Sequence, residues 1–314
     1  MVSGVRHSGT FPTKAHALAW EADKRTSPGD VKTAHGKKTC ADAFKKYELE
    51  ISKGKDGYRW EALRLASMAE SSLGPVRMSD LNATHVAAWR DERLRTIPAG
   101  RTRPVQGATV TREMNLLSHV FSIARKEWKW ISESPTADVA RPKANPPRDR
   151  RITPAEIDMI CIALGWRPDA VGIKPQTKQQ RIACAFLFAL ETAMRAGEIC
   201  ALAEGDVVGR VARLHKTKNG LPRDVALSGR AMEIWQMVPE GFGITTATLD
   251  ALFRRARNTT PIEGLTFHDT RHEAITRLAG KLNVLDLAPM VGHQDIRQLQ
   301  TYYNATAADI AAKL

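Results

Sequence analysis

A short stretch near the middle of the chain restricts its fold more than any other feature. Residues 139–150 (VARPKANPPRDR) hold three prolines and four positive charges in twelve residues. Proline removes a backbone donor and pushes the preceding residue out of helical geometry, so neither a helix nor a central strand can run through this stretch. We expect an extended basic linker between two separately folded parts, which a chain of 314 residues is long enough to form.

Helical periodicity dominates the chain before this linker. Apolar residues recur three and four positions apart, on one face of a helix, in the segments 39–52, 58–72, 82–96 and 110–130. We therefore expect a helical domain over residues 39–138. Residues 1–38 are too few for a domain of their own, and they combine a turn and one amphipathic helix with a Pro/Gly/Lys linker.

The chain after the linker mixes helices with a small sheet. Thr153 and Glu156 have the spacing of a capping box at a helix start. Residues 209–228 (GRVARLHKTKNGLPRDVALS) contain two strands, and Asn219-Gly220 favours a type I′ hairpin turn between them. The pattern around this hairpin is helical, which predicts a fold class that is mainly α with a small antiparallel β-sheet. We expect a second domain over residues 151–302 and a tail over residues 303–314.

The excess of positive charge favours a polyanionic partner. The formal net charge is +13, and residues 1–150 hold 27 Lys and Arg against 17 Asp and Glu, whereas residues 151–314 hold 20 against 17. Basic side chains bind nucleic acid by displacing counterions, without regard to sequence. The alternative is a basic protein whose charge only keeps it soluble. If the partner is DNA, most of the hold on it should come from residues 1–150.

Membrane and secreted classes are disfavoured. The longest apolar run, residues 182–190 (IACAFLFAL), is half the length of a membrane-spanning helix, and Glu191 follows it. The amino terminus (MVSGVRHSGTF) lacks the apolar core of a secretory signal. Four cysteines without metal-binding spacing are expected to be reduced thiols, at positions 40, 161, 184 and 200. We expect a cytoplasmic, nucleoid-associated protein without a membrane partner.

Side chains suited to phosphodiester chemistry follow in the second domain. Cutting a phosphodiester without a metal requires cations on the non-bridging oxygens, a positioned nucleophile and an acid for the leaving oxygen. Arg195 stands at a turn into a helix, and its guanidinium can donate two parallel hydrogen bonds to a phosphate. Glu198 is either its helical ion-pair partner or a group that orients it.

A histidine and an arginine three residues apart form a second candidate. His268 and Arg271 share one helix face if Thr266 or Asp269 begins the helix. Histidine can exchange a proton near neutral pH while the arginine holds a phosphate. The ordinary alternative is a helix start without catalytic meaning, and His272 is expected on a different face of the helix.

Four segments in chain order resemble the tyrosine recombinase (phage integrase) family: MRAGEI, TKNGLPRDVAL, FHDTRHEAIT and VGHQDIRQLQTYY. The resemblance covers residues 39–314. It implies a helical core-binding domain joined by the linker to a mixed α/β catalytic domain, the two forming a C-shaped clamp on DNA. It also implies site-specific recombination of DNA.

The resemblance assigns catalytic positions residue by residue. Arg195 matches the first family arginine, and His268 with Arg271 matches the HxxR box. His293 matches a position that is histidine or tryptophan in the family. Tyr302, nine residues beyond His293, has the family spacing for the nucleophile, whereas Tyr303 lies ten beyond.

The family lysine, which protonates the 5′ oxygen, lies before the hairpin turn. Counting back from the second strand assigns it to Lys218, although strand alternation puts Lys216 on the same face and keeps it as the alternative. Two positions depart from the family pattern. Ala193 stands where glycine is usual, and Thr270 stands where leucine is usual. Ala193 matters only if that turn requires a positive φ.

The implied reaction is attack of the tyrosine on the scissile phosphate, which gives a 3′-phosphotyrosyl bond and a free 5′-hydroxyl. That hydroxyl later attacks the phosphotyrosine of a partner strand, so bond energy is kept and neither ATP, a cofactor nor a metal is expected. The sequence agrees, because it has no phosphate-binding GxxxxGK[ST] loop and no metal-ligand spacing. The implied roles are phosphate stabilisation by Arg195, Arg271 and His293, proton transfer by His268 and Lys218, and support of the cations by Glu198 and Asp269.

The implied partners are double-stranded attachment sites, a homotetramer on two paired sites, a host DNA-bending protein and an excisionase. Within the tetramer the tail docks on a neighbouring protomer, the alternative being a helix packed on its own domain. Residues 9–25 resemble the end of the arm-type domain of phage integrases, with its preceding strands missing, which favours a prophage or genomic-island integrase. Two alternatives remain, a type IB topoisomerase and a catalytically silent DNA-binding protein on the same scaffold.

Overall fold

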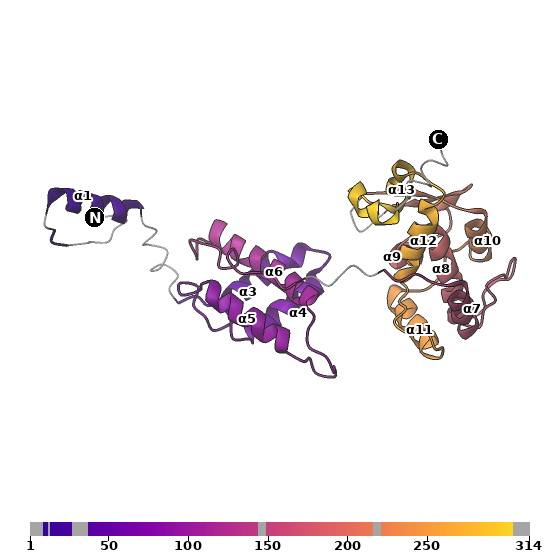
Figure 1. Ribbon diagram of the computed structural model, residues 1–314, viewed down its shortest axis with the longest axis horizontal. Coiled ribbons are helices and arrows are strands. Elements are labelled where there is room, and N and C mark those ends of the chain that lie inside the picture. The colour runs from indigo at the N-terminus through magenta and orange to yellow at the C-terminus, as the bar shows by residue number, and fades with distance from the viewer. Residues whose placement is uncertain (1–8, 12, 27–36, 144–148, 216–220, 304–314) are drawn as a thin grey trace. The chain divides into compact units, whose positions relative to one another are not determined.

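The chain forms two compact units, residues 1–147 and residues 148–314 (Figure 1). The computed structural model describes residues 9–11, 13–26, 37–143, 149–215 and 221–303. Within these ranges no helix is both long and apolar enough to cross a membrane. Mostly helical elements with a three-stranded antiparallel sheet confirm the predicted fold class.

The first unit is helical, as its periodicity predicts. Its described elements are α1 (Lys14–Thr26), α3 (Cys40–Glu50), η1 (Ser52–Gly54), α4 (Tyr58–Ala69), α5 (Ala83–Arg95) and α6 (Gly107–Lys126). Local signals begin two of them: Thr39 forms a capping box with Asp42, and Asn82 accepts hydrogen bonds from the first backbone amides of α5. In α6 apolar residues recur at helical spacing and face the core, among them Val110, Met114, Leu117 and Phe121.

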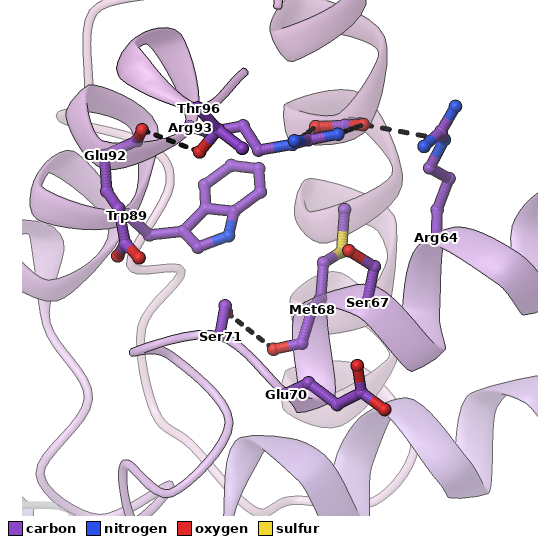
Figure 2. Close-up of a pocket in the computed structure, with 10 residues that line it drawn as sticks. Arg64, Ser67, Met68, Glu70, Ser71, Trp89, Glu92, Arg93 and Thr96 are labelled. Atoms are coloured by element: carbon purple, nitrogen blue, oxygen red, sulfur yellow. Dashed lines mark hydrogen bonds and ion pairs between the residues drawn. The ribbon is translucent and has the colours of Figure 1, made fainter. Parts of the chain in front are cut away.

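A buried carboxylate ties three of these helices together. Glu113 of α6 is 1% exposed and accepts two hydrogen bonds from Arg93 of α5, at 2.8 and 3.0 Å. Arg64 of α4 lies 3.5 Å from the same carboxylate, and Figure 2 shows the guanidinium groups of Arg64 and Arg93 pointing toward each other. They border a hollow of about 170 Å³ that Met68 and Trp89 also line. A buried charge with this pairing is tolerated because its hydrogen bonds replace those to water.

The second unit is built around α8 (Lys178–Thr192). Residues 182–190 are all buried, so the apolar run noted in the sequence is a central helix. Helices on several sides pack against it, as Figure 1 shows: α7 (Pro154–Ala163), α9 (Ala196–Ala201), α10 (Gly229–Met237), α11 (Thr246–Asn258) and α12 (Asp269–Ala279). The chain continues through α13 (Val284–Val291) and the 3₁₀ helix η2 (Ile296–Tyr302).

Local chemistry explains several boundaries in this unit. The capping box of Thr153 and Glu156 is confirmed, and Pro154 occupies the first turn of α7, where its missing N–H is not needed. The sheet runs β1 (Val207–Val208), β2 (Val211–Leu214) and β3 (Arg223–Ala226), with all neighbours antiparallel. The predicted hairpin strands are therefore present, and the turn residues Asn219 and Gly220, with Lys216 and Lys218, lie outside the described residues.

Candidate active site

The catalytic candidates lie at the ends of helices that meet beside α8. Arg195 is the N-cap of α9, His268 is the N-cap of α12, and Arg271 lies in the first turn of α12. His293 follows the end of α13, and Tyr302 ends η2. The charges of Arg195 and Arg271 both act on His293, and the charge of Arg271 acts on Tyr302. Four of the predicted residues are thus brought together from segments far apart in the chain.

The turn between α8 and α9 has the left-handed backbone that the sequence could not reveal. Ala193 is the C-cap of α8, with φ of 55° and ψ of 16°. Residues with a Cβ rarely adopt this conformation because the Cβ crowds the backbone. The turn therefore does need a positive φ, and the alanine in the usual glycine position carries that cost. The same turn delivers Arg195 into the site.

Glu198 holds Arg195 in place and keeps its own negative charge. Its carboxylate accepts hydrogen bonds from the Arg195 backbone at 2.8 Å and from Arg195 Nη1 at 2.9 Å. Arg223 Nη1 and Nη2 donate two more, at 2.8 and 2.7 Å. Burial works to raise the pKa of Glu198, but the hydrogen bonds from Arg223 and Arg195 lower it to about 2. A fully charged carboxylate therefore fixes the orientation of both arginines.

Arg271 is a buried cation whose guanidinium bridges two loops. Its Nη1 donates to the Ala193 carbonyl at 2.5 Å, and its Nη2 donates to the Val291 carbonyl at 2.6 Å. Burial, followed by the nearby charge of Arg195, lowers the pKa of Arg271 to about 10. The side chain therefore stays protonated at neutral pH and joins the ends of α8 and α13 around one positive charge.

His293 is neutral in this environment. Burial lowers its pKa to about 4, and the charges of Arg271, Arg195 and Arg223 act in the same direction. Its Nδ1 is buried and has no hydrogen-bond partner within the described residues. An imidazole with an unused ring nitrogen beside three cations is suited to an anionic oxygen, which would supply the missing partner.

The loop that carries His293 has a tight backbone contact with the hairpin. Gly292 has φ of 69°, which favours glycine, and a Cβ there would lie 3.0 Å from Arg223 Nη1, so a larger residue would also press on that guanidinium. A hollow of about 200 Å³ separates the start of β3 from this loop, lined by residues that include Pro222, Arg223 and His293. The hairpin side of the site is therefore open to a ligand.

The two tyrosines, Tyr302 and Tyr303, have different contacts and different electrostatic surroundings. Tyr303 donates its hydroxyl to the Leu282 carbonyl at 2.9 Å. Tyr302 is half-buried and packs against the ring of His272, with ring centroids 5.0 Å apart. Burial raises the pKa of Tyr302, and the charge of Arg271 opposes that rise by stabilising the phenolate. Of the two, Tyr302 is the tyrosine on which the charge of Arg271 acts.

Two further candidates lie at the start of α12. His268 is exposed, and its backbone carbonyl accepts a hydrogen bond from the Arg271 backbone at 3.1 Å. Asp269 is buried and accepts hydrogen bonds from the Thr266 backbone at 2.7 Å and hydroxyl at 3.0 Å. Asp269 thus fastens the loop that precedes the helix, and its predicted support of a cation stays a prediction.

Comparison with known proteins identifies the family. The model of the phage integrase family matches residues 240–309, a range that contains His268, Arg271, His293 and Tyr302. A Haemophilus influenzae protein assigned as an integrase/recombinase is 36% identical over 87% of this chain and 89% of its own length. The chain belongs to the phage integrase family. The shufflon-specific DNA recombinase of Escherichia coli is 35% identical over 88% of this chain and 72% of that protein.

The integrase fold agrees with solved structures. A lambda integrase tetramer bound to a Holliday junction superposes with a TM-score of 0.68, covering 95% of this chain and 88% of that chain at 16% sequence identity. At this level of identity the likeness concerns the fold. It confirms the expectation, drawn from four short motifs, that the chain has the tyrosine recombinase architecture.

Sequence reasoning missed two residues of this integrase site. Arg223 served only to count the strand register, yet it forms the shorter of the two ion pairs of Glu198, at 2.7 Å, with a side chain that is 10% exposed. The only sequence signal for Arg223 was a basic residue at the start of the second hairpin strand. His272 was expected on another face of its helix, and the packing of η2 brings Tyr302 onto its ring. No local pattern carries that contact.

Proposed function

We propose that this chain is a site-specific DNA recombinase that cuts and rejoins strands through a 3′-phosphotyrosyl bond at Tyr302. Family membership and recombinase relatives support the reaction class and disfavour the topoisomerase and the silent DNA-binding protein. One observation supports the residue assignment: the charge of Arg271 acts on Tyr302, and the same charge acts on His293, whereas the hydroxyl of Tyr303 is bonded to the backbone.

Arg195 and Arg271 supply the positive charge that a pentavalent phosphate requires. Arg195 is oriented by Glu198, and Arg271 is held by two carbonyls, so neither cation must reorganise when the phosphate arrives. The neutral His293 adds a hydrogen-bond donor without adding a titrating charge at neutral pH. These groups would hold the two non-bridging oxygens while the Tyr302 oxygen attacks in line.

Proton transfer completes the reaction. As Tyr302 attacks phosphorus, its O–H bond breaks, its proton passes to His268, and the bond to the 5′ oxygen breaks. Lys218, or Lys216 as the alternative, donates a proton to that leaving oxygen. The 3′ phosphate is then bonded to Tyr302, and the reverse sequence with a 5′-hydroxyl from a partner strand rejoins the DNA and frees the tyrosine.

The substrates in this proposal are double-stranded attachment sites of a prophage or genomic island. A homotetramer on two paired sites would exchange the strands, and the tetrameric lambda integrase supports that assembly. We propose that residues 39–138 form the core-binding domain, 139–150 the linker, 151–302 the catalytic domain and 303–314 a tail docked on a neighbouring protomer. A DNA-bending protein and an excisionase would assist, and the enzyme would act in the bacterial cytoplasm.

The experiment is covalent capture of DNA. The full chain is incubated with sheared DNA of its source genome, denatured, and precipitated, and the DNA attached to it is sequenced. We expect one short sequence to be enriched, with the protein on its 3′ phosphate. Tyr302→Phe should bind the same DNA and yield no adduct, whereas Tyr303→Phe should still yield one. An adduct formed by Tyr302→Phe and lost in Tyr303→Phe would reverse the assignment.

A further inference from the structure

The end of the basic linker is anchored to α12 by a buried carboxylate. Glu273 is 3% exposed and accepts hydrogen bonds from Arg151 Nε at 2.7 Å, from the Ile152 backbone at 3.1 Å and from Arg277 Nε at 2.7 Å. Burial works to raise the pKa of Glu273, but these partners lower it to about 2. The carboxylate is therefore charged at neutral pH and fixes the register of residues 151–152 against the helix.

A linker residue two positions before Arg151 contacts the histidine that packs on the candidate nucleophile. Asp149 Oδ1 lies 3.5 Å from Nε2 of His272, the neighbour of Glu273 on α12. The ring of the same imidazole packs against Tyr302, with centroids 5.0 Å apart and ring planes at 53°. His272 thus contacts both Asp149 and Tyr302, and all three residues belong to the same unit, 148–314. The negative charge of Asp149 also acts on Tyr302 directly and works to raise the pKa of its hydroxyl.

The anchor and the contact differ in strength. Glu273 is buried and accepts four hydrogen bonds from three residues, whereas the Asp149 side chain is 88% exposed and its contact with His272 is longer than an ordinary hydrogen bond. The Asp149 contact can therefore form or break while the anchor stays intact. His272 Nδ1 is buried and has no hydrogen-bond partner within the described residues, so ring packing and Asp149 are what orient the imidazole.

We propose that Asp149 and His272 are positioning residues that set the orientation of the nucleophilic tyrosine. The linker carboxylate holds the imidazole, and the imidazole holds the Tyr302 ring for in-line attack. The proposal rests on Tyr302 being the nucleophile. Positioning of this kind matters because displacing a reacting atom by about 1 Å can slow a reaction about a hundredfold. It also links the segment that joins the two units to the group that cuts the DNA.

The first test needs no DNA. The chain has four tyrosines, so the full protein labelled with 3-fluorotyrosine gives four fluorine resonances, assignable by single Tyr→Phe substitutions. We expect Asp149→Asn and His272→Gln to shift the Tyr302 resonance and to leave those of Tyr47 and Tyr58 in place. Asp158→Asn, at an exposed position on α7, removes the same charge and should shift none of them. A Tyr302 resonance unmoved by Asp149→Asn would overturn the proposal.

The second test measures adduct formation in a single turnover on the captured sequence. Since the proposal has Asp149 act through His272, we expect His272→Ala to slow cleavage at least about tenfold and Asp149→Asn about threefold, with the double variant no slower than His272→Ala. DNA affinity should stay within about twofold, which separates positioning from binding. His272→Phe keeps the ring but cannot pair with Asp149, so it should match Asp149→Asn.

Failure of this proposal can be distinguished from failure of the proposed function. Independent, additive losses for Asp149 and His272 would refute the coupling, as would equal rates for Asp149→Asn and Asp158→Asn. A wild-type protein that forms no adduct on any DNA would instead refute the proposed function, whatever the fluorine spectra show.

Discussion

Arg223 donates two hydrogen bonds to the carboxylate of Glu198, at 2.8 and 2.7 Å. Its Nε donates a third to the Met290 carbonyl at 3.0 Å, at the end of α13. One guanidinium on the hairpin therefore braces both the turn that carries Arg195 and the loop that carries His293. Because the hairpin also holds the candidate lysines, this ion pair ties together elements that each carry a different candidate catalytic residue.

Acid should weaken the protein through Glu198. The pKa of this buried carboxyl is about 2 in the folded chain and about 4.3 in an unfolded one. A lowered pKa stabilises the fold fully above the unfolded value, and that contribution, roughly 3 kcal/mol, is lost as the pH falls toward 2. Urea unfolding at pH 7 and pH 3 measures it.

The matched variants are Glu198→Gln and Glu204→Gln, the second at an exposed position. At pH 7, Glu198→Gln should unfold about 3–5 kcal/mol more easily, because it leaves two arginines without their anion. Its deficit should shrink at pH 3, and Glu204→Gln should behave as wild type. If the loss of unfolding free energy in Glu198→Gln were the same at pH 7 and pH 3, Glu198 would not be the charged carboxylate assigned here.

His293 should be neutral until the pH is well below physiological values. Its pKa of about 4 lies below that of a free histidine, so its contribution to stability is complete above about pH 6.5 and is lost as the pH falls toward 4. Histidine-detected NMR should give a midpoint near 4 in the free protein. Binding of inorganic phosphate should raise that midpoint, because an anion stabilises the imidazolium.

Variants at His293 separate its hydrogen bond from its titration. The family also uses tryptophan at this position, so His293→Trp should retain cleavage within about tenfold, whereas His293→Ala should lose about a hundredfold or more. Single-turnover adduct formation between pH 5.5 and pH 8 checks both. A rate in wild type that falls with a midpoint near 6.5, and is flat in His293→Trp, would show that the imidazole does titrate in this range.

Ala193→Gly should be far better tolerated than its burial suggests. Removing a buried methyl costs stability, but glycine relieves a left-handed conformation worth about 1 kcal/mol. The control is Ala189→Gly, one turn earlier in α8 and equally buried at 0% exposed. Ala189→Gly loses the buried methyl and the helix propensity of alanine, and no left-handed conformation is relieved in return. In urea unfolding it should therefore be at least about 1 kcal/mol more destabilised than Ala193→Gly. Equal losses would argue against the positive φ.

Lys218 should be the acid for the leaving 5′ oxygen. Lys218→Ala should slow single-turnover cleavage about a hundredfold or more, and Lys216→Ala should have a small effect. A substrate whose leaving oxygen is replaced by sulfur needs little protonation, so it should restore the Lys218→Ala variant. Rescue of Lys216→Ala alone would transfer the role to Lys216.

Local chemistry was readable from the sequence. The capping box of Thr153 and Glu156 spans three residues, the hairpin strands follow from turn chemistry and alternation, and the order of Arg195, His268, Arg271, His293 and Tyr302 led to a family that the comparisons confirm. These signals can be read from the sequence because each depends only on residues that are close together in the chain. The distinction between Lys216 and Lys218 was not readable, since both lie on one face of a strand.

The tertiary structure set the environment of those residues. Arg271 donates a hydrogen bond to the Ala193 carbonyl, 78 positions away in the chain, and Arg151 donates one to Glu273, 122 positions away. The left-handed turn at Ala193, the brace of Arg223 on Glu198, the low pKa of His293 and the packing of His272 on Tyr302 all arise from such contacts. Burial and electrostatic fields depend on distance in space, so the sequence determined the family and the candidate residues, and only the fold determined their charge, orientation and neighbours.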